Sequence, residues 1–518
     1  MEIFSVYPCE REFAREGEFM TKQELFNLRN GTDVRGTAIE EKDDPVTLTD
    51  EAVSLIGRAF YAWTLQKTNR ERAAIAIGYD SRLSSPHVAG LIAEAVSRSG
   101  GDAILTGLSS TPSMFMLLQS SFGADASVMV TASHLPYQKN GLKFFLKSGG
   151  LEGSDVQEVL EIAADGDFRR GNGTVTERSY LSEYAEGLVS MVRAQCGDEK
   201  PLAGKRIVVD AGNGAGGFYA DLVLKPLGAD TTGSQFLDPD GSFPNHIPNP
   251  ENEEAMKSVC NAVVRNKADF GIIFDTDVDR AGAVSPDGEE INRNRLIALI
   301  SAVLLKEQKG AYIVTDSVTS DGLAEFIAKK GGVHRRFKRG YKNVINESKR
   351  LNAEGKYSPL AIETSGHAAL KENYFLDDGA YLVTKLLISL ARLAKEGKNL
   401  LDLIKDLPEP EEAAEVRLKF ETPDFKAVGK DIISALTATA IEKPYLSLAP
   451  ENCEGVRINF DKDHGNGWAL VRLSLHEPIL PVNAESNEKG GVKKILSELY
   501  KYLKEYPFLN TENLKKSL

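Results

Sequence analysis

One pattern recurs three times along this chain: an apolar run ends in a polar turn, and a helix-forming segment follows. The three runs lie at residues 74–79, 206–210 and 311–315. Short apolar runs of this kind are typical of strands buried on both faces of a parallel sheet. Three units with the same order of strand, turn and helix therefore predict three α/β domains of one ancestral plan.

Each unit also contains a second predicted strand that ends in a polar loop. The first such loop presents Ser133, the second reads Asp275-Thr276-Asp277-Val278-Asp279-Arg280, and the third reads Glu363-Thr364-Ser365-Gly366-His367. Loops at strand ends usually carry the chemistry of α/β folds, because the strands hold them in place. These three loops are therefore the first candidates for functional residues.

A Pro- and Glu-rich linker at residues 407–415 separates the three units from a segment of different texture. After it we predict strands at residues 416–420 and 468–475 and helices at 425–438 and 492–506. This mixture indicates a smaller α+β domain. The expected divisions are an N-terminal extension at 1–27 and domains at 28–196, 197–302, 303–408 and 414–518.

The composition limits the classes of partner. The chain has 518 residues and a net charge of -13, which argues against broad binding to nucleic acid or to an anionic membrane. No run is long and apolar enough to span a bilayer, and the N-terminus lacks the apolar segment of a signal peptide. Because the four cysteines are far apart, we expect a reduced compartment and a cytoplasmic protein.

The loop around Ser133 consists of small residues closed by Pro136. We expect an exposed loop, and its ordinary alternative is a serine that caps a helix or forms a turn. His134 follows directly, but adjacent side chains rarely point at one another. The loop alone therefore does not predict a Ser–His nucleophile pair.

The three aspartates at positions 275, 277 and 279 carry the next most informative signal. In an extended segment, residues at i, i+2 and i+4 share a side, so three carboxylates can converge. They repel one another unless a hard cation lies among them, and oxygen ligands suit Mg²⁺ or Ca²⁺. The alternative is a solvated acidic turn. Arg280 is well placed to hold a phosphate beside such a metal.

Other motifs are weaker. Residues 212–217 fit G-x-G-x-x-G after a strand, and Asp230 lies where a ribose-binding acid is expected in a dinucleotide-binding enzyme. Asp210 argues against this reading, because its charge would lie close to the pyrophosphate. Arg35, between two glycines, can meet an anion or form a surface salt bridge. The basic segments 338–342 and 472–478 can be binding loops or solvated charge runs.

Taken together, these loops resemble the α-D-phosphohexomutase family, and specifically its phosphoglucomutase/phosphomannomutase branch. The segment 131–136 is similar to that family's phosphoserine loop, and 275–280 to its metal loop. Arg339-Gly340-Tyr341 resembles the third-domain loop, and 363–367 the sugar loop. The resemblance extends from about Leu28 to the end of the fourth domain. It implies three α/β/α domains with mixed sheets and a smaller α+β domain, arranged around a central cleft.

Two loops depart from the pattern of this branch. Ile362 stands where the sugar loop normally begins with Gly. In the fourth-domain phosphate loop, normally Arg-Pro-Ser-Gly/Asn-Thr-Glu-Pro, the Pro, Gly/Asn and Thr are replaced by Leu473, Leu475 and His476. These changes remove a hydroxyl donor and a flexible backbone, and His476 is the candidate replacement donor.

The resemblance also ranks the substrates. The phosphoglucosamine branch usually has Asn where Leu135 stands and Gln where Thr364 stands. Neither residue is present, so glucose and mannose phosphates rank above glucosamine phosphate.

The activity implied by the resemblance is a phosphohexomutase that interconverts hexose 1-phosphate and hexose 6-phosphate. It would use a phosphoserine and a bisphosphorylated sugar intermediate. The implied catalytic residues are Ser133, His134, Lys143 and Arg35, and the implied ligands of one Mg²⁺ are Ser133, Asp275, Asp277 and Asp279. The implied substrate-binding residues are Arg280, Arg339, Gly340, Tyr341, Glu363, Ser365, His367, Arg472, Ser474 and His476.

Further expectations concern protonation and partners. Lys143 is the candidate general acid or base, which requires a lowered pKa. Glucose 1,6-bisphosphate is the expected activator, and small hexose phosphates are the expected partners of a monomer or dimer. Three alternatives stay open: a metal-dependent phosphatase, a dinucleotide-binding oxidoreductase, and a non-catalytic sugar-phosphate sensor.

Overall fold

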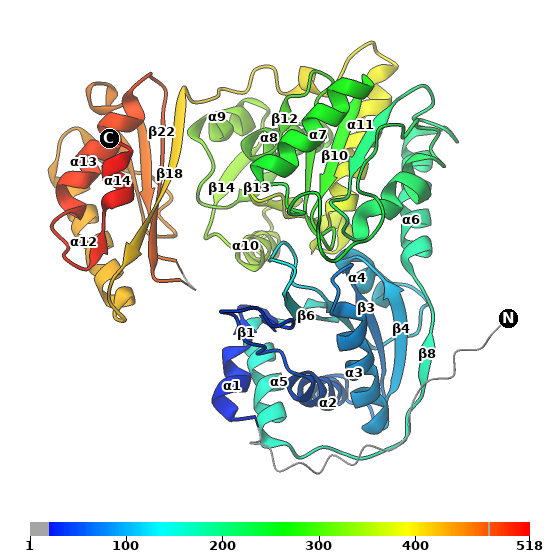
Figure 1. Cartoon of the computed structure of the whole chain (residues 1–518). Helices are drawn as coiled ribbons and strands as arrows, with labels where there is room; N and C mark the ends of the chain where they lie inside the picture. Colours follow the sequence, from blue (N-terminus) through cyan, green and yellow to red (C-terminus); the bar gives the residue numbers. More distant parts are fainter. Residues whose placement is uncertain (1–19, 475–476) are drawn as a thin grey trace.

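Four β-sheets, taken in chain order, organise the computed structural model, which describes residues 20–474 and 477–518 (Figure 1). The first three sheets combine parallel and antiparallel strands and carry helices, whereas the fourth is antiparallel throughout. This arrangement confirms the predicted fold class of three α/β/α domains and a smaller α+β domain.

The first sheet consists of β1 (Arg29–Asn30), β2 (Asp33–Thr37), β3 (Ala74–Tyr79), β4 (Asp102–Leu108), β5 (Ala126–Val130), β6 (Lys139–Leu146), β7 (Gly149–Gly150) and β8 (Val175–Glu177). Their order is β1-β2-β6-β5-β3-β4-β8, with β7 beside β6. One face packs against α2 (Asp50–Thr68), α3 (Ser85–Arg98) and α5 (Gly153–Asp165). The other face packs against α4 (Thr111–Gln119).

The second sheet has the order β12-β11-β10-β9. Its strands are β9 (Ile207–Asp210), β10 (Phe270–Phe274), β11 (Ala281–Val284) and β12 (Glu290–Ile291). Its helical segments are η1 (Ala215–Gly217), η2 (Tyr219–Leu224), α7 (Glu253–Asn266) and α8 (Arg293–Glu307). Because β10 runs parallel to β9, the turns after both strands lie at the same edge of this sheet.

The third sheet has the order β14-β13-β15-β16-β17. Its strands are β13 (Tyr312–Thr315), β14 (Val333–Arg336), β15 (Leu360–Ile362), β16 (Ala368–Leu370) and β17 (Leu376–Asp377). The accompanying helices are α9 (Asp321–Lys329), α10 (Tyr341–Ala353), η3 (Lys371–Asn373), α11 (Gly379–Ala394) and η4 (Leu401–Leu403).

One apolar core joins the first three domains. It extends from α4, behind the first sheet, through the second sheet and α8 to α9 and α11 of the third domain. The helix α6 (Leu181–Cys196) lies within this core, where Tyr184 donates a hydrogen bond of 2.7 Å to the buried Asp378. The three sheets are therefore fixed relative to one another by shared apolar burial.

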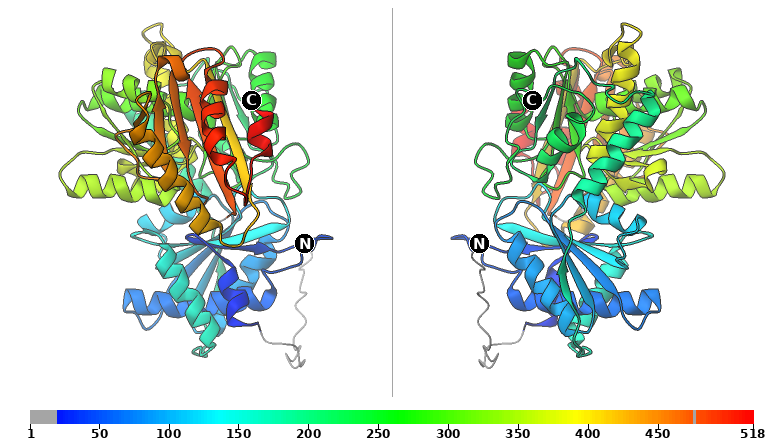
Figure 2. Two further views of the ribbon diagram at one scale, coloured as in Figure 1. Left: turned by 90° about the vertical axis from the view of Figure 1, so that its left-hand side faces the viewer. Right: turned by 90° about the vertical axis from the view of Figure 1, so that its right-hand side faces the viewer.

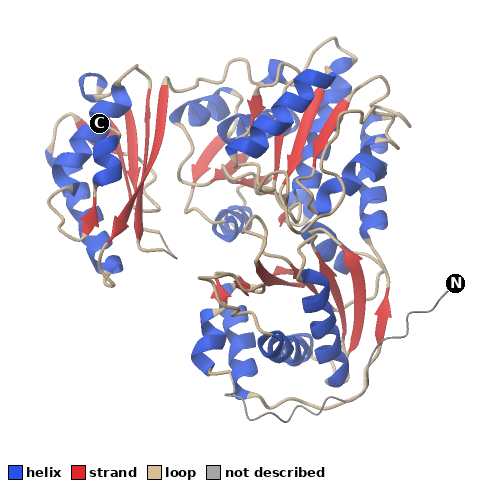
Figure 3. Ribbon diagram, viewed as in Figure 1, coloured by secondary structure: helices blue, strands red, loops and turns tan. Residues whose placement is uncertain are grey.

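The fourth domain has a core of its own. Its strands are β18 (Glu412–Phe420), β19 (Leu446–Leu448), β20 (Val456–Phe460), β21 (Gly467–Val471), β22 (Ile479–Ser486) and β23 (Leu509–Asn510), in the order β19-β20-β21-β22-β18-β23. The helices α12 (Phe425–Glu442), η5 (Lys462–His464), α13 (Gly491–Leu503) and α14 (Glu512–Lys516) complete it. Figure 3 shows α12, α13 and α14 on one side of this sheet, so the other side is turned toward the remaining domains.

Some local predictions change in extent. The strand expected at 468–475 ends at Val471, and α12 continues to Glu442, four residues beyond the expected end. Within the expected N-terminal extension, α1 (Lys22–Asn27) begins with a capping box between Thr21 and Glu24. It buries Leu25 in the apolar core between the first sheet and α2, α3 and α5. Residues 1–19 lie outside the described part of the chain.

Helices of the described residues are all too short or too polar to cross a membrane.

Candidate functional site

The Ser133 loop and the aspartate loop meet between the first two sheets. The hydroxyl of Ser133 donates to a carboxylate oxygen of Asp275 at 3.0 Å and accepts a hydrogen bond from Arg280 at 3.0 Å. Ser133 is only 3% exposed, so the expectation of an exposed loop is wrong for the serine itself, although Pro136 in the same loop is exposed. The second domain covers the serine, which the sequence of the loop could not indicate.

His134 lies beside the serine after all. Its Nδ1 is 3.3 Å from the Ser133 hydroxyl, and Arg280 donates a hydrogen bond to the same nitrogen. The argument against a contact between neighbours failed because Ser133 has a φ of 51°, a left-handed conformation that redirects the chain. Burial, followed by Arg280 and Arg35, lowers the pKa of His134 to about 2. The imidazole is therefore a neutral acceptor.

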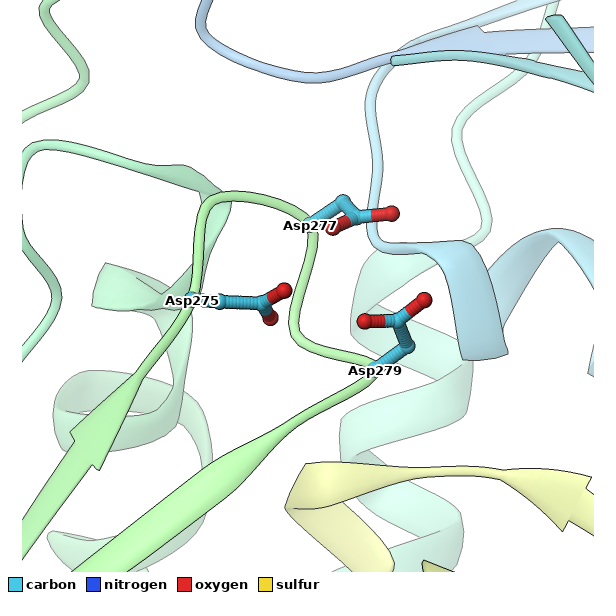
Figure 4. A group of neighbouring side chains, drawn as sticks. All are labelled: Asp275, Asp277 and Asp279. Atoms are coloured by element: carbon cyan, nitrogen blue, oxygen red, sulfur yellow. The ribbon is translucent and has the colours of Figure 1, made fainter. Parts of the chain in front are cut away.

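Asp275, Asp277 and Asp279 converge on the loop between β10 and β11 (Figure 4). Each offers an oxygen within 4.8 Å of the others, and all three residues are buried. Burial, together with the neighbouring carboxylates, raises the pKa of Asp275 well above its ordinary value. One oxygen each of Asp277 and Asp279 is buried without a hydrogen-bond partner in the described chain. This donor set fits a hard divalent cation.

Two neighbouring segments brace the aspartate loop. Thr111, at the start of α4, donates its hydroxyl to Asp277, and its N–H donates to the Asp277 carbonyl at 2.8 Å. On the other side, the N–H of Ala215 donates to the Thr276 carbonyl at 2.8 Å. Sequence reasoning missed Thr111, and no local pattern marks it.

The glycine-rich turn has a packing role here. A Cβ at Gly214 would lie 2.7 Å from the Thr276 carbonyl oxygen, so only glycine permits this approach to the aspartate loop. Asp230 is bound by Arg206 at 2.7 Å, next to the start of β9, whereas the glycine turn follows the end of that strand. The alternative of a dinucleotide site, in which this turn would act together with Asp230, is therefore not supported.

Lys143, on β6, donates to Asp277 at 2.9 Å and also to Asp279. Burial lowers the pKa of Lys143, but the charges of Asp277 and Asp279 outweigh burial and raise it well above the ordinary value. The expectation of a lowered pKa is therefore not met, because the aspartates that hold the ammonium group come from another domain. Arg35 donates to Asp33 at 2.9 Å and to the Ala132 carbonyl at 3.2 Å, so it braces the backbone of the serine loop.

The third domain contributes a polar cluster at the end of β15. Glu363 accepts the N–H of Gly340 at 2.6 Å, and burial, then the charge of Asp316, raises the pKa of Glu363 to about 8. His367 is within 2.9 Å of the Ser365 hydroxyl and 3.7 Å from Asp279.

The structure also places Tyr341, a predicted substrate-binding residue, and Ile362, which departs from the family pattern. Tyr341 stacks its ring on His367 at 5.6 Å, but its hydroxyl points to Thr32 of the first domain at 2.5 Å. Ile362, where the family pattern has Gly, is the last residue of β15 and is fully buried.

The fourth-domain loop is only partly described. Arg472 lies 3.9 Å from Glu454, and its buried Nε has no hydrogen-bond partner in the described residues. The hydroxyl of Ser474 accepts the N–H of Glu477 at 3.3 Å. His476, the candidate replacement donor, lies outside the described residues. Glu454 also accepts a hydrogen bond of 2.6 Å from Ser317, which links the third and fourth domains.

A cavity of about 730 Å³ lies where the four domains face one another. His134 of the first domain and Arg339 of the third line this cavity, and Arg417 and Lys516 line it from the fourth domain. The complete lining is His134, Asn249, Glu251, Arg293, Arg339, Glu415, Val416, Arg417, Asn513, Lys516 and Ser517. Sequence reasoning did not identify the C-terminal helix as part of this site.

Three family models match the chain in succession. They describe phosphoglucomutase/phosphomannomutase alpha/beta/alpha domain I at residues 27–170, domain II at 182–288 and domain III at 292–410. A phosphoglucomutase from Neisseria meningitidis is 31% identical over 89% of this chain and 95% of its own. A phosphomannomutase/phosphoglucomutase from Pseudomonas syringae is 29% identical over 91% and 94%.

A solved structure agrees over nearly the whole length. A phosphoglucomutase/phosphomannomutase family protein from Burkholderia thailandensis superposes with a TM-score of 0.77 and 28% sequence identity, and covers 94% of this chain and 98% of its own.

Proposed function

This chain belongs to the phosphoglucomutase/phosphomannomutase family, and we propose that it carries out the family's phosphohexomutase reaction with Ser133 as the phosphate carrier. It interconverts hexose 1-phosphate and hexose 6-phosphate. Glucose and mannose phosphates are the proposed substrates, since relatives are named for both sugars. The phosphatase and sensor alternatives are not favoured.

The observation that supports this proposal is the position of the Ser133 hydroxyl between Asp275 and Arg280. A phosphoryl group on that oxygen would adjoin both the carboxylate cluster and a buried guanidinium. Arg280 is held by Asp275 at 3.0 Å, so its charge is already aimed at the serine. Charge placed in advance is most of what phosphoryl transfer requires of a protein.

Asp275, Asp277 and Asp279, together with a phosphate oxygen on Ser133, are the proposed ligands of one Mg²⁺. When bound, the metal would supply Lewis-acid stabilisation of the charge on the phosphoryl group. The buried oxygens of Asp277 and Asp279 that lack partners in the described chain support this assignment.

Lys143 is proposed to neutralise charge on the phosphoryl group. Its raised pKa keeps it protonated but makes it a weak acid, so the ammonium group suits charge neutralisation rather than proton transfer. His134 stays neutral and orients Arg280 beside the serine.

Substrate binding is assigned to the third and fourth domains. Glu363, Ser365 and His367, with Gly340 and Tyr341 beside them, are proposed to contact the sugar hydroxyls. Arg339, Arg472 and Ser474 are proposed to bind the phosphate that does not react. Transfer of the phosphoryl group from Ser133 to the sugar would give a bisphosphorylated sugar and free the serine hydroxyl. This intermediate must reverse its orientation before the second transfer, and the cavity of about 730 Å³ is the proposed place for that movement.

Phosphorus NMR tests the proposal. Purified enzyme with Mg²⁺, a trace of glucose 1,6-bisphosphate as activator, and glucose 1-phosphate should produce glucose 6-phosphate. A parallel sample with mannose 1-phosphate ranks the two sugars by initial rate. Growth of free phosphate instead would identify a phosphatase, and unchanged spectra with both sugars would contradict the proposed substrates.

A further inference from the structure

Arg82 is a fully buried arginine in the turn between β3 and α3. It does not touch the reacting atoms, and the mechanism above does not use it. All five of its guanidinium N–H donors are engaged. The acceptors are one carboxylate oxygen of Asp80 and the main-chain carbonyls of Ser133, Leu135, Pro136 and Lys139.

These four carbonyls belong to the loop that presents the reactive serine and to the first residue of β6. The distances are 2.6 Å to Leu135, 2.7 Å to Pro136 and 3.0 Å to Lys139, and the carbonyl of Ser133 itself is the fourth acceptor. Ser133 has a left-handed φ of 51°, a conformation that a non-glycine residue retains only when its surroundings impose it. Arg82 supplies a large part of that constraint from beneath the loop.

Asp80 aims the guanidinium. It accepts the Nε–H of Arg82 at 3.2 Å and the main-chain N–H of Arg82 at 3.0 Å, and Ser85 donates to it at 2.8 Å. Asn140, one residue into β6, donates to Ser85 at 3.0 Å. The arginine therefore cannot rotate away from the serine loop without breaking several buried hydrogen bonds.

The second domain closes the other side of Arg82. The Phe243 ring lies 5.3 Å from the guanidinium carbon. A Cβ at Gly241 would lie 2.6 Å from the Arg82 carbonyl carbon and 2.3 Å from the Leu83 nitrogen. A loop of the metal-binding domain thus packs directly on the turn that carries Arg82. Arg82 therefore lies at the contact between the first domain, which carries the serine loop, and the second domain, which carries the aspartates.

We propose that Arg82 is a positioning residue for phosphoryl transfer, which holds the backbone of Ser133 so that its Oγ stays between Asp275 and Arg280. This inference rests on the proposed role of Ser133 as phosphate carrier. Lysine cannot replace this planar guanidinium group, which donates to four carbonyls and one carboxylate. The ammonium group of lysine has only three donors.

The test is the variant Arg82→Lys in the full-length enzyme. Wild type and variant are first phosphorylated with glucose 1,6-bisphosphate, and phosphoryl transfer from Ser133 to glucose 1-phosphate is then followed in a single turnover. We expect transfer to slow by about 100-fold, because a displacement near 1 Å of a reacting group has an effect of this size. The KM should stay within about twofold, since the substrate-binding residues are unchanged.

The matched control is Arg206→Lys. Arg206 also bridges a carboxylate and a main-chain carbonyl, Asp230 and Asn266, each at 2.7 Å, but beside the start of β9, away from the serine loop. The Arg206 side chain is 40% exposed, so Arg206→Lys should lower Tm less than Arg82→Lys, and a rate loss per folded molecule that is confined to Arg82→Lys supports positioning. An equal single-turnover rate in Arg82→Lys and wild type would overturn the inference.

Asp80→Asn provides a second route if Arg82→Lys does not fold. It keeps the guanidinium but removes the charge of Asp80 and replaces one accepting oxygen by an NH2 group, and we expect about a tenfold slower transfer. Full-rate transfer in a folded Asp80→Asn enzyme would overturn the inference in that case. If wild type itself transfers no phosphate from Ser133, the proposed function fails, an outcome distinct from a normal rate in the variants.

Discussion

The junction between the first and second domains and the junction between the third and fourth are built from different kinds of contact. At the first, an apolar core runs continuously beneath a buried polar network that contains Ser133, Arg280 and the aspartates. At the second, the cores are separate. There Glu451, Glu454 and Arg457 reach across with hydrogen bonds and ion pairs.

We infer from this difference that the first junction serves phosphoryl transfer and that the second serves the binding of substrate. A junction with a shared core keeps reacting groups in register, as phosphoryl transfer requires. Domains with separate cores are expected to move relative to one another more readily than domains that share a core. The left view of Figure 2 shows the fourth domain, in orange and red, in front of the second and third domains. We expect the fourth domain to swing about the linker at residues 407–411.

The largest expected effect follows from Ser133→Ala, which removes the phosphate carrier from the rigid junction. Without a nucleophilic oxygen the two-step path is closed, and we expect kcat to fall by about 10⁴-fold or more. A coupled assay for glucose 6-phosphate measures the loss. The control Ser434→Ala, on an exposed turn of α12, should keep full activity. Near-normal activity in Ser133→Ala would remove the basis for a phosphoserine mechanism.

Loss of the metal should have the next largest effect. Asp279→Asn, or wild type treated with EDTA, should lose at least about 100-fold in kcat, because a bound cation supplies several kcal/mol of charge stabilisation. Readdition of Mg²⁺ should restore the EDTA-treated enzyme but only partly restore the variant. Activity that is insensitive to EDTA after extensive dialysis would show that the three carboxylates serve another purpose.

Glu454→Ala tests the junction between the third and fourth domains. The change removes hydrogen bonds of 2.6 Å to Ser317 and 3.0 Å to the N–H of Arg339. Hydrogen bonds to a charged group contribute about 1.5–3 kcal/mol, so we expect KM to rise about tenfold with kcat nearly unchanged. The radius of gyration from X-ray scattering should increase. An unchanged KM and radius would mean that other contacts keep this junction closed.

A smaller effect is expected at the cleft wall. Lys516 lines the cavity, whereas Lys515, its exposed neighbour on α14, does not. For Lys516→Glu we expect KM to rise about threefold at low salt, since exposed charges contribute less than about 1 kcal/mol. The difference should shrink at high salt. Lys515→Glu is the matched control, and equal KM values for the two variants would exclude a specific role for Lys516.

The smallest expected effect concerns stability and pH. Glu363 has a pKa of about 8, raised by burial and by Asp316 from an ordinary 4.5. Between these two pH values the folded state holds a proton that the unfolded state releases, so the free energy of unfolding falls as pH rises from about 4.5 to about 8. Glu363→Gln cannot ionise, and its Tm should fall about 2 °C less than that of wild type between pH 6 and 9. Parallel curves of Tm against pH would contradict the raised pKa.

Local sequence was sufficient for residues whose role follows from their neighbours in the chain. The three aspartates share a loop and repeat at i, i+2 and i+4, so their convergence was predictable. The apolar runs that end in polar turns likewise predicted three α/β domains. Thr111, Arg82 and Glu454 act on loops far away in the chain, and nothing near them in sequence marks those partners.

By itself, the sequence determined the domain plan and the identity of the loops that bear hydroxyl, carboxylate and guanidinium groups. The burial of Ser133, the contact between Ser133 and His134 and the raised pKa of Lys143 were decided only by tertiary structure. The contact with His134 follows from the left-handed φ of Ser133, whereas the other two features share one physical reason. Burial and charge act through space, and the groups that cover Ser133 and hold Lys143 come from a second domain more than a hundred residues away in the chain.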